Sequence, residues 1–268
     1  MIVDAHAHVW KAVPAYPNPA VTTMSPASDV PLELFTQYLD EHGVDRAVLV
    51  QPMFPGEDNS LVADAARAEP GRFAAVCVVD PRKPDQLEYW VRERGCRGLR
   101  LRPKFAGEEE LFEHDPLWER AARLGIVISV LANLNHVPAI ARRAERFPAV
   151  PIIVDHLAHP DIAAGVGAPD FQALLALSRF PAVSVKPTGF YYYSKTGYPY
   201  DDCVGHFKAV YDRFGPDRLI WGSDFPHLLL KTPYRRSLRL LEERHPWLGK
   251  ADRDKIMGGN ALRLYWGR

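Results

Sequence analysis

An excess of charge of one sign is the first thing that this sequence lacks. Its 268 residues carry 33 Lys and Arg against 33 Asp and Glu, a formal net charge of +0. Proteins that bind nucleic acids or anionic membrane surfaces usually need surplus positive charge, so we expect neither partner. Hydrophobic residues make up 47% and charged residues 25% of the chain, which is typical of a folded globular protein rather than a disordered one.

Cysteine and long apolar runs are also scarce. The three cysteines are widely spaced without a CxxC pair, so the sequence gives no sign of a zinc ribbon or a disulfide framework, and we expect a cytoplasmic protein. No apolar run approaches the ~18 residues that a membrane span requires, and the N-terminal residues do not form a signal peptide. The sequence leaves open whether the chain forms a homo-oligomer.

Eight short β-branched runs, each followed by a longer stretch, are the most regular feature. Most of these stretches are amphipathic and have the end signals of helices. The runs lie at 2–8, 46–52, 73–80, 97–103, 125–133, 150–156, 182–188 and 218–224. The predicted helices lie at 32–43, 59–70, 85–95, 115–125, 136–148, 171–181 and 204–215. Alternating strands and helices pair in parallel, so the pattern predicts an α/β fold, a single-domain (β/α)8 TIM barrel over residues 1–268.

Two features bear on this fold assignment. An open doubly wound sheet is the rival, but it would carry a glycine-rich phosphate turn after the first strand, where this sequence has His-Ala-His. Two irregular stretches stand out: 11–31 is rich in proline and shows no helical periodicity, and 189–203 is rich in tyrosine and glycine. Loops of this length serve either as lids and binding loops or as plain surface excursions.

Polar residues end several of the predicted strands, where barrel enzymes carry their chemistry. His6 and His8 stand two apart in the first run, which places both imidazoles on one face pointing into the barrel. His156 ends the sixth run and Asp224 the eighth, at the same rim. Each alone is weak evidence, but together they predict a metal or proton-transfer centre. We expect one divalent ion, zinc in the first place and manganese in the second.

Basic residues end two further runs. Arg100 and Arg102 share one face of the fourth run and would enter the barrel mouth, while Lys186 ends the seventh. A buried arginine needs an anionic partner, which is either an internal carboxylate, such as Asp224 or Asp80, or a carboxylate of the substrate. The three cations together predict a small anionic substrate.

Other polar residues have less certain roles. Gln51 ends the second run and either binds the substrate or caps the barrel. Tyr191 lies in the stretch 189–203 and is expected to line the pocket. Four histidines fall on helices or helix ends and are expected to be exposed to solvent: His42, His114, His206 and His245.

Five segments together resemble the amidohydrolase superfamily: DAHAHVW, VLVQP with a following GEDNS, IIVDH, LIWGSDFPH and GGNALRLYW. The likeness runs from residue 2 to about 266 and is greatest to the amidohydrolase-2 branch, which includes 2-pyrone-4,6-dicarboxylate lactonase and sugar-lactone hydrolases. It implies that the family's strand-one pair falls on His6 and His8, its mid-chain histidine on His156 and its strand-eight aspartate on Asp224. In that family the aspartate is the general base toward the hydrolytic water.

The sequence departs from the superfamily pattern in two places. Dinuclear members carry a bridging lysine or glutamate at the end of strand four, whereas this run reads RGLRLRP, so a two-metal site is disfavoured. Phe225 replaces the tryptophan of the family's GSDWPH motif, which we interpret as a change of pocket shape. The pyrone lactonase that this chain resembles works without a metal, so a metal-free mechanism stays open.

The leading hypothesis is a hydrolase that opens a small carboxylate-bearing lactone. Asp224 is the expected base and His156 a second catalytic group, with Arg100, Arg102 and Lys186 orienting the substrate. A decarboxylase of an aromatic or muconate-type acid is the alternative enzyme. A non-catalytic barrel that binds an anionic metabolite is the alternative from another class.

Overall fold

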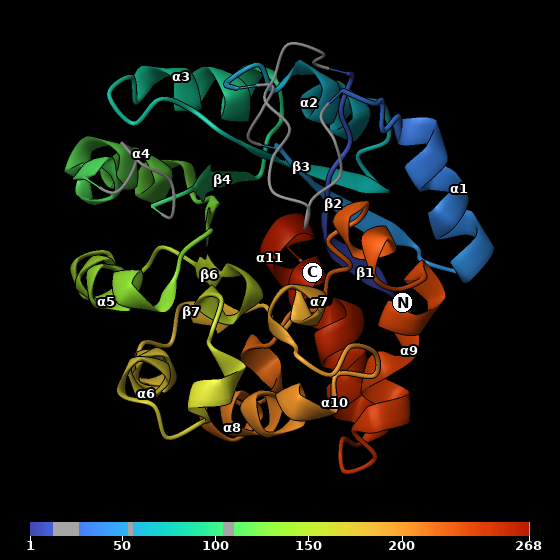
Figure 1. Ribbon diagram of the computed structural model, residues 1–268. Coiled ribbons are helices and arrows are strands. Elements are labelled where there is room, and N and C mark those ends of the chain that lie inside the picture. Colours follow the sequence, from blue (N-terminus) through green and yellow to red (C-terminus); the bar gives the residue numbers. More distant parts are fainter. Residues whose placement is uncertain (13–26, 53–55, 104–109, 268) are drawn as a thin grey trace.

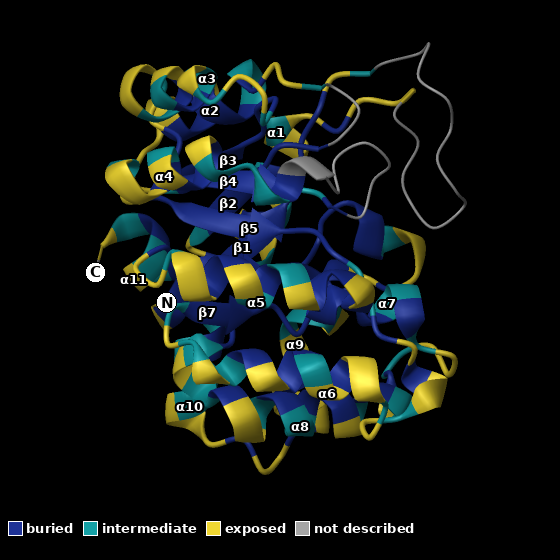
Figure 2. Cartoon of the chain, turned by 90° about the vertical axis from the view of Figure 1, so that its left-hand side faces the viewer, coloured by how far each residue is buried: buried dark blue, intermediate teal, exposed yellow. Residues whose placement is uncertain are grey.

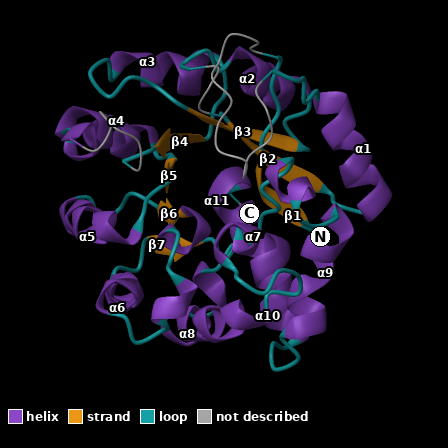
Figure 3. Ribbon diagram, viewed as in Figure 1, coloured by secondary structure: helices purple, strands orange, loops and turns teal. Residues whose placement is uncertain are grey.

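Seven short parallel strands form one curled sheet in the computed structural model, which describes residues 1–12, 27–52, 56–103 and 110–267. The strands follow one another around the sheet in chain order, as the alternating pattern predicts, and a ring of helices surrounds them (Figures 1 and 3). They are β1 Val3–Ala7, β2 Arg46–Val50, β3 Phe73–Cys77, β4 Gly98–Leu101, β5 Val127–Val130, β6 Ile152–Val154 and β7 Val183–Val185.

The predicted helices form at the expected places. The stretch at 85–95 divides into a short α-helix and a π-helical turn, Tyr89–Glu93. Gly43 and Gly125 take up the left-handed conformation that ends α1 and α4. The helices are α1 Leu32–His42, α2 Ser60–Ala68, α3 Asp85–Glu88, α4 Asp115–Leu124, α5 Val137–Arg146, α6 Pro169–Ala176, α7 Phe190–Tyr193, α8 Val204–Phe214, α9 Tyr234–Arg244, α10 Lys250–Asp254 and α11 Asn260–Trp266.

The eighth predicted strand is not formed as a regular strand. Leu219 makes an isolated bridge to β7, and Phe225 makes one to β1. Between them Asp224 has a left-handed φ of 61°, which no continuous β-ladder accommodates. The segment 218–225 therefore lies between the two edges of a seven-stranded sheet, and the prediction of eight regular strands was wrong at this element.

Apolar side chains fill both faces of the sheet. A small inner cluster includes Val48 and Val76 and is completed by Ala261 and Tyr265 of α11, while a larger outer cluster packs the strands against the surrounding helices. The strands are buried except for Arg46 at the start of β2, and the helices are exposed on their outer faces (Figure 2). The α11 helix lies with both termini at one end of the molecule, and α7 lies at the opposite end, near the carboxyl ends of the strands (Figure 2).

The structure treats the two irregular stretches, 11–31 and 189–203, differently. Residues 13–26, most of the stretch 11–31, lie outside the described residues. The stretch 189–203 contains α7 and a 3₁₀ turn, Asp201–Cys203, so it is not a plain loop. Among the described residues, no helix combines the length and the apolar character that a membrane crossing demands.

Two histidines predicted to be exposed are buried. His206 and His245 are each only 3% exposed. Their rings pack against Phe171 and Phe207 at centroid distances of 4.7 and 4.4 Å. Burial lowers the pKa of both imidazoles, that of His245 to about 4. The prediction of exposure was wrong because it took account of helix position but not of which helix face turns toward the core.

His245 is expected to make the fold sensitive to mild acid. The unfolded chain binds a proton at the ordinary histidine pKa of 6.5, whereas the folded protein does so only near 4. Stability should therefore fall as the pH drops through 6.5 and stop falling below about 4, a loss of about 1 to 2 kcal/mol by pH 5. Urea unfolding of His245→Phe at pH 7.5 and pH 5 should show a smaller difference than the wild type. The control is His42→Phe at a half-exposed site; equal pH dependence in both variants would contradict the prediction.

Candidate active site

The first strand brings His6 and His8 to the carboxyl end of the sheet. Val3 and Ala5 belong to the inner apolar cluster, so strict alternation would turn His6 outward. The register of β1 against β2 shifts between Asp4 and Ala7, and His6 points inward with its ring 5.0 Å from that of His8. The two imidazoles thus share one site through an irregularity in β1 rather than through ideal alternation.

The turn after Leu219 delivers Asp224 to the same place. A Cβ at Gly222 would lie 2.7 Å from both Cβ and the backbone nitrogen of His6, so only glycine lets this turn approach β1 so closely. The backbone N–H of Asp224 then donates to the carbonyl of His6 at 2.8 Å. The left-handed φ of Asp224 directs its carboxylate inward, beside the histidines.

Three imidazoles and a phenol surround the Asp224 carboxylate. Its Oδ1 lies 3.3 Å from His8 Nε2 and 3.7 Å from His6 Nε2. Its Oδ2 lies 3.8 Å from His156 Nε2 and accepts a 2.5 Å hydrogen bond from the Tyr191 hydroxyl. The sequence assigned Tyr191 to the substrate pocket, and the structure places its hydroxyl on the predicted base. Oδ2 is therefore occupied, and Oδ1 is the oxygen that faces His6 and His8.

The hydrogen bond of His8 fixes its tautomer. Its Nδ1 lies 2.7 Å from the backbone carbonyl of Val50, and because a carbonyl only accepts, Nδ1 carries the proton. In the neutral ring, Nε2 then presents a lone pair to Asp224 Oδ1 at 3.3 Å. Two acceptors at this distance repel unless a proton or a cation lies between them, so the His8–Asp224 pair marks a place for one or the other.

His156 reaches the site through an unusual backbone. It follows β6 with a positive φ of 50°, and its Nδ1 is 3.0 Å from the Thr188 hydroxyl. A Cβ at Gly189 would lie 2.9 Å from that nitrogen, so glycine is needed where β7 leads into α7. The packing holds the ring with Nε2 directed at Asp224.

A buried ion-pair network lies behind His6. Lys186 Nζ is 3.0 Å from Asp155 Oδ1 and 3.0 Å from His6 Nδ1, and all three side chains are completely buried. The Ser129 hydroxyl lies 2.8 and 2.9 Å from the two oxygens of Asp155. Asp155 was missed as a site residue, although it stands beside His156 in the IIVDH segment and at an inward position after β6.

The internal partner proposed for Arg100 needs correction. Its Nε lies 3.8 Å from Asp155 Oδ2, so Asp155 rather than Asp224 or Asp80 is its ion-pair partner. Asp80 instead accepts a 2.8 Å bond from Arg82. Sequence spacing could not decide among these carboxylates because the choice depends on how β4 and β6 are staggered around β5.

The electrostatics set the charge states at neutral pH. Burial opposes ionisation of both carboxylates, but Lys186 and His6 lower the pKa of Asp155, and the imidazoles of His156, His8 and His6 lower that of Asp224, in each case well below 3.8. Burial lowers the pKa of His6 and His156. Both carboxylates are therefore ionised at neutral pH while these two imidazoles are neutral.

The remaining predicted residues lie farther out. The Gln51 side-chain amide donates to the carbonyls of Gly56 and Asp58 at 3.3 and 2.9 Å, which favours a capping role. Arg102 follows β4 and is partly exposed.

Two aromatic residues complete the wall next to His8. The His227 ring lies 5.4 Å from that of His8 and stacks on Trp10 at 5.7 Å. Burial lowers the pKa of His227 to about 4. His227 follows Asp224 by three residues, a spacing visible in the sequence, whereas nothing in the sequence distinguished Trp10.

The donor atoms of His6, His156 and Asp224 all lie within 4.8 Å of one another, close enough for one metal ion to bind them. His6 Nε2 is buried and makes no hydrogen bond with the described residues, and His8 adds the lone pair described above. Neutral imidazoles with one carboxylate are a suitable set for a transition-metal ion. The residues therefore fit a single divalent ion.

The curled parallel sheet and the histidine–aspartate cluster at its carboxyl end are features of hydrolytic barrel enzymes. The chain belongs to the amidohydrolase family, whose family model matches residues 3–266. It is 30% identical to 4-sulfomuconolactone hydrolase of Rhizobium radiobacter over 280 residues, 98% of this chain and 89% of that one. It is 30% identical to L-fucono-1,5-lactonase of Burkholderia ambifaria over 279 residues, 98% and 94% of the two chains. A crystal structure of a Burkholderia multivorans amidohydrolase with bound zinc superposes with a TM-score of 0.86 at 25% identity, covering 99% of each chain. The family resemblance seen in the sequence motifs is confirmed.

Proposed function

We propose that this enzyme hydrolyses a small lactone bearing a negatively charged group, with Asp224 as general base. The observation that carries the proposal is the position of the Asp224 carboxylate, buried among three imidazoles with Oδ2 held by Tyr191 and Oδ1 facing the site. The names of relatives such as 4-sulfomuconolactone hydrolase and L-fucono-1,5-lactonase support lactones as the substrate class.

The reaction needs one proton carrier. Asp224 accepts a proton from water as the water oxygen bonds to the lactone carbonyl carbon. The tetrahedral intermediate then collapses, the bond from the carbonyl carbon to the ring oxygen breaks, and Asp224 returns the proton to that oxygen. The Tyr191 hydroxyl keeps Oδ2 occupied, so Oδ1 is the oxygen that carries the proton.

Arg100 is the residue we assign to the negative group of the substrate. It is 5% exposed, and its Nε makes no hydrogen bond with the described residues. At 3.8 Å, Asp155 is an ion-pair neighbour rather than a hydrogen-bond acceptor for Nε. A substrate carboxylate or sulfonate would supply the missing acceptor, and Arg102 and Lys186 would add positive potential.

A divalent ion would be held by His6, His8, His156 and Asp224, with zinc the first candidate for such donors. When bound, the ion supplies Lewis acidity to the carbonyl and lowers the pKa of the attacking water. A mechanism without a metal is the alternative, and it depends on Lys186. Because an ammonium group can only donate, Lys186 determines which nitrogen of His6 carries the proton. In that alternative Lys186 donates to His6 Nδ1 at 3.0 Å, so the His6 proton would lie on Nε2 and would polarise the carbonyl directly. In the metal-bound alternative the proton would lie on Nδ1, which is also 3.5 Å from Asp155.

The Arg100→Gln variant tests the substrate class. Purified enzyme is assayed on lactones that differ only in having a carboxylate, a sulfonate or a neutral group, with the metal content measured by elemental analysis before and after chelation. We expect Arg100→Gln to lower kcat/KM about 10- to 100-fold for the charged lactones and to leave the slow turnover of neutral lactones within about threefold.

Arg97→Gln is the matched control. Arg97 immediately precedes β4 at its other end and donates to the carbonyl of Tyr265, so its kcat/KM should stay within about threefold of the wild type. Equal losses on charged and neutral lactones would contradict the role of Arg100. Release of CO₂ from aromatic acids without lactone turnover would point to a decarboxylase instead, and binding without turnover to an anion-binding barrel.

A further inference from the structure

Asp4 makes a set of hydrogen bonds that the reaction above does not use. It is completely buried in β1. Its Oδ1 accepts from the backbone N–H groups of Ser223 and His6, at 2.8 and 3.2 Å. Its Oδ2 accepts from the hydroxyls of Ser223 and Tyr234, the latter at 2.8 Å. Four donors therefore converge on one carboxylate, and two of them belong to the residue next to Asp224.

The Ser223 hydroxyl extends this connection to the other side of Asp224. The backbone N–H of Phe225 donates to Ser223 Oγ at 2.9 Å. Since that oxygen accepts from Phe225, its own proton is directed to Asp4 Oδ2. The residues on both sides of Asp224 are thus tied, directly or through one hydroxyl, to a single carboxylate in β1.

Asp224 needs such a connection because of its backbone conformation. A φ of 61° is rare for a residue with a side chain and persists only where the surroundings enforce it. In an extended conformation, the Asp224 side chain would leave the histidines. The backbone of this turn therefore determines whether the carboxylate faces the site.

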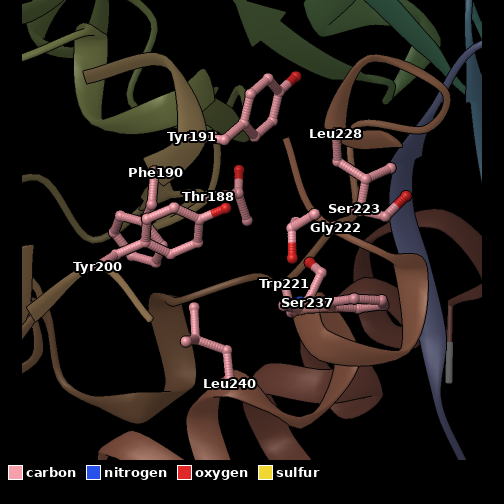
Figure 4. Close-up of a pocket in the computed structure, with 12 residues that line it drawn as sticks. Thr188, Phe190, Tyr191, Tyr200, Trp221, Gly222, Ser223, Leu228, Ser237 and Leu240 are labelled. Atoms are coloured by element: carbon pink, nitrogen blue, oxygen red, sulfur yellow. The ribbon is translucent and has the colours of Figure 1, made fainter. Parts of the chain in front are cut away.

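A small cavity borders the turn on one side. Gly222 and Ser223 line a cavity of about 20 Å³, a space that fits about one water molecule. They face Thr188 and Tyr200 across it, as Figure 4 shows. The hydrogen bonds to Asp4 therefore add to the close packing of Gly222 on His6 in holding the turn.

From this geometry we propose that Asp4 is a positioning residue, which acts through Ser223 to hold the Asp224 carboxylate toward the histidines. The proposal rests on the proposed function, in which Asp224 is the base. The proposal also gives the aspartate of the DAHAH segment a role. Asp4 holds the segment 218–225 in place, whereas His6 and His8 of the same segment lie in the site itself.

A pair of conservative variants separates positioning from general stability. Ser223→Ala and Tyr234→Phe each remove one hydroxyl that donates to Asp4. Only the first also removes the oxygen that accepts from the backbone of Phe225, next to Asp224, while the backbone N–H of residue 223 still donates to Asp4. We expect Ser223→Ala to lower kcat about 100-fold with KM changed less than about threefold, as expected when a reacting group is displaced by about 1 Å. Tyr234→Phe should lower the melting temperature to a similar extent and kcat less than about threefold. Ser223→Thr, which keeps the hydroxyl, should recover most of the activity.

Crystal structures of Ser223→Ala and Tyr234→Phe give a readout that needs no substrate. In Ser223→Ala the Asp224 carboxylate is expected to leave the Tyr191 hydroxyl, whereas in Tyr234→Phe it should stay. An unmoved Asp224 in Ser223→Ala, or equal losses of kcat in the two variants, would overturn the positioning role. Failure of every lactone as a substrate would instead count against the proposed function, and the two crystal structures would still decide the role of Asp4.

Discussion

Asp224→Asn is expected to lower kcat about a thousandfold while KM changes less than about threefold. Asparagine has nearly the same shape and can still accept the Tyr191 hydrogen bond, but it cannot take a proton from water. The carboxylate it replaces is ionised at neutral pH, because its pKa lies well below 3.8 despite its burial. Steady-state kinetics on the best lactone, with binding of the ring-opened product measured by calorimetry, would separate lost chemistry from lost binding.

Asp80→Asn is the matched control for this variant. Asp80 is nearly buried and follows β3, but it pairs with Arg82 rather than with the histidines. The same chemical change there should leave kcat within about threefold. Retention of more than a tenth of the wild-type kcat by Asp224→Asn would show that another group accepts the proton.

Lys186→Met is expected to lower the free energy of unfolding by about 3 to 5 kcal/mol. Lys186 and Asp155 are both completely buried, with Nζ and Oδ1 3.0 Å apart. Without the ammonium, the buried Asp155 carboxylate keeps two partners. These are the Ser129 hydroxyl, which donates to it, and Arg100, whose Nε lies 3.8 Å away. Denaturant unfolding at pH 7 measures the loss, and a loss below about 1 kcal/mol would contradict this view of the pair.

The pH dependence of Lys186→Met provides a second readout. In the wild type, the pKa of Asp155 is well below 3.8, so its contribution to stability is present above that ordinary value and is lost as the pH falls through the lower folded value. Without Lys186, burial should raise the pKa of Asp155. The stability difference between wild type and variant should therefore narrow as the pH falls toward 4.

Two further variants complete the test of the pair. Lys186→Met combined with Asp155→Leu should recover most of the lost stability, because an apolar pair leaves no charge unpaired. Lys208→Met removes an exposed pair with Asp212 and should cost less than about 1 kcal/mol. A double variant as unstable as the single one would show that packing, rather than charge, dominates at this site.

The sequence predicted the strands and most helices because their signals are local. Periodicity located β1 to β7, and the position of polar residues at strand ends brought out His6, His156 and Asp224. The eighth strand was predicted wrongly because the close approach of Gly222 to His6 and the backbone of Asp224 are tertiary features. The apolar, β-branched residues of the run 218–224 are typical of a strand and give no indication of these two features.

The sequence could not predict which polar and charged side chains contact one another in the fold. Asp155 pairs with Arg100 because of the stagger of β4 and β6 around β5, which no spacing along the chain encodes. The bonds of Asp4 depend on α9, a helix that was not predicted and that lies 230 residues away in the chain at Tyr234. The burial of His245 likewise depends on the neighbour that it packs against.

The buried charges beside His6 have a consequence for product release. In the absence of a bound metal ion, Arg100 and Lys186 are balanced by Asp155 and Asp224, so the centre is close to electroneutral with His6 and His156 neutral. An anionic lactone brings one negative charge into this centre. Ring opening creates a second carboxylic acid that ionises at neutral pH, next to the carboxylate that has just returned its proton. In the metal-free mechanism, the site would therefore repel its product more strongly than its substrate, and turnover itself would favour emptying the site.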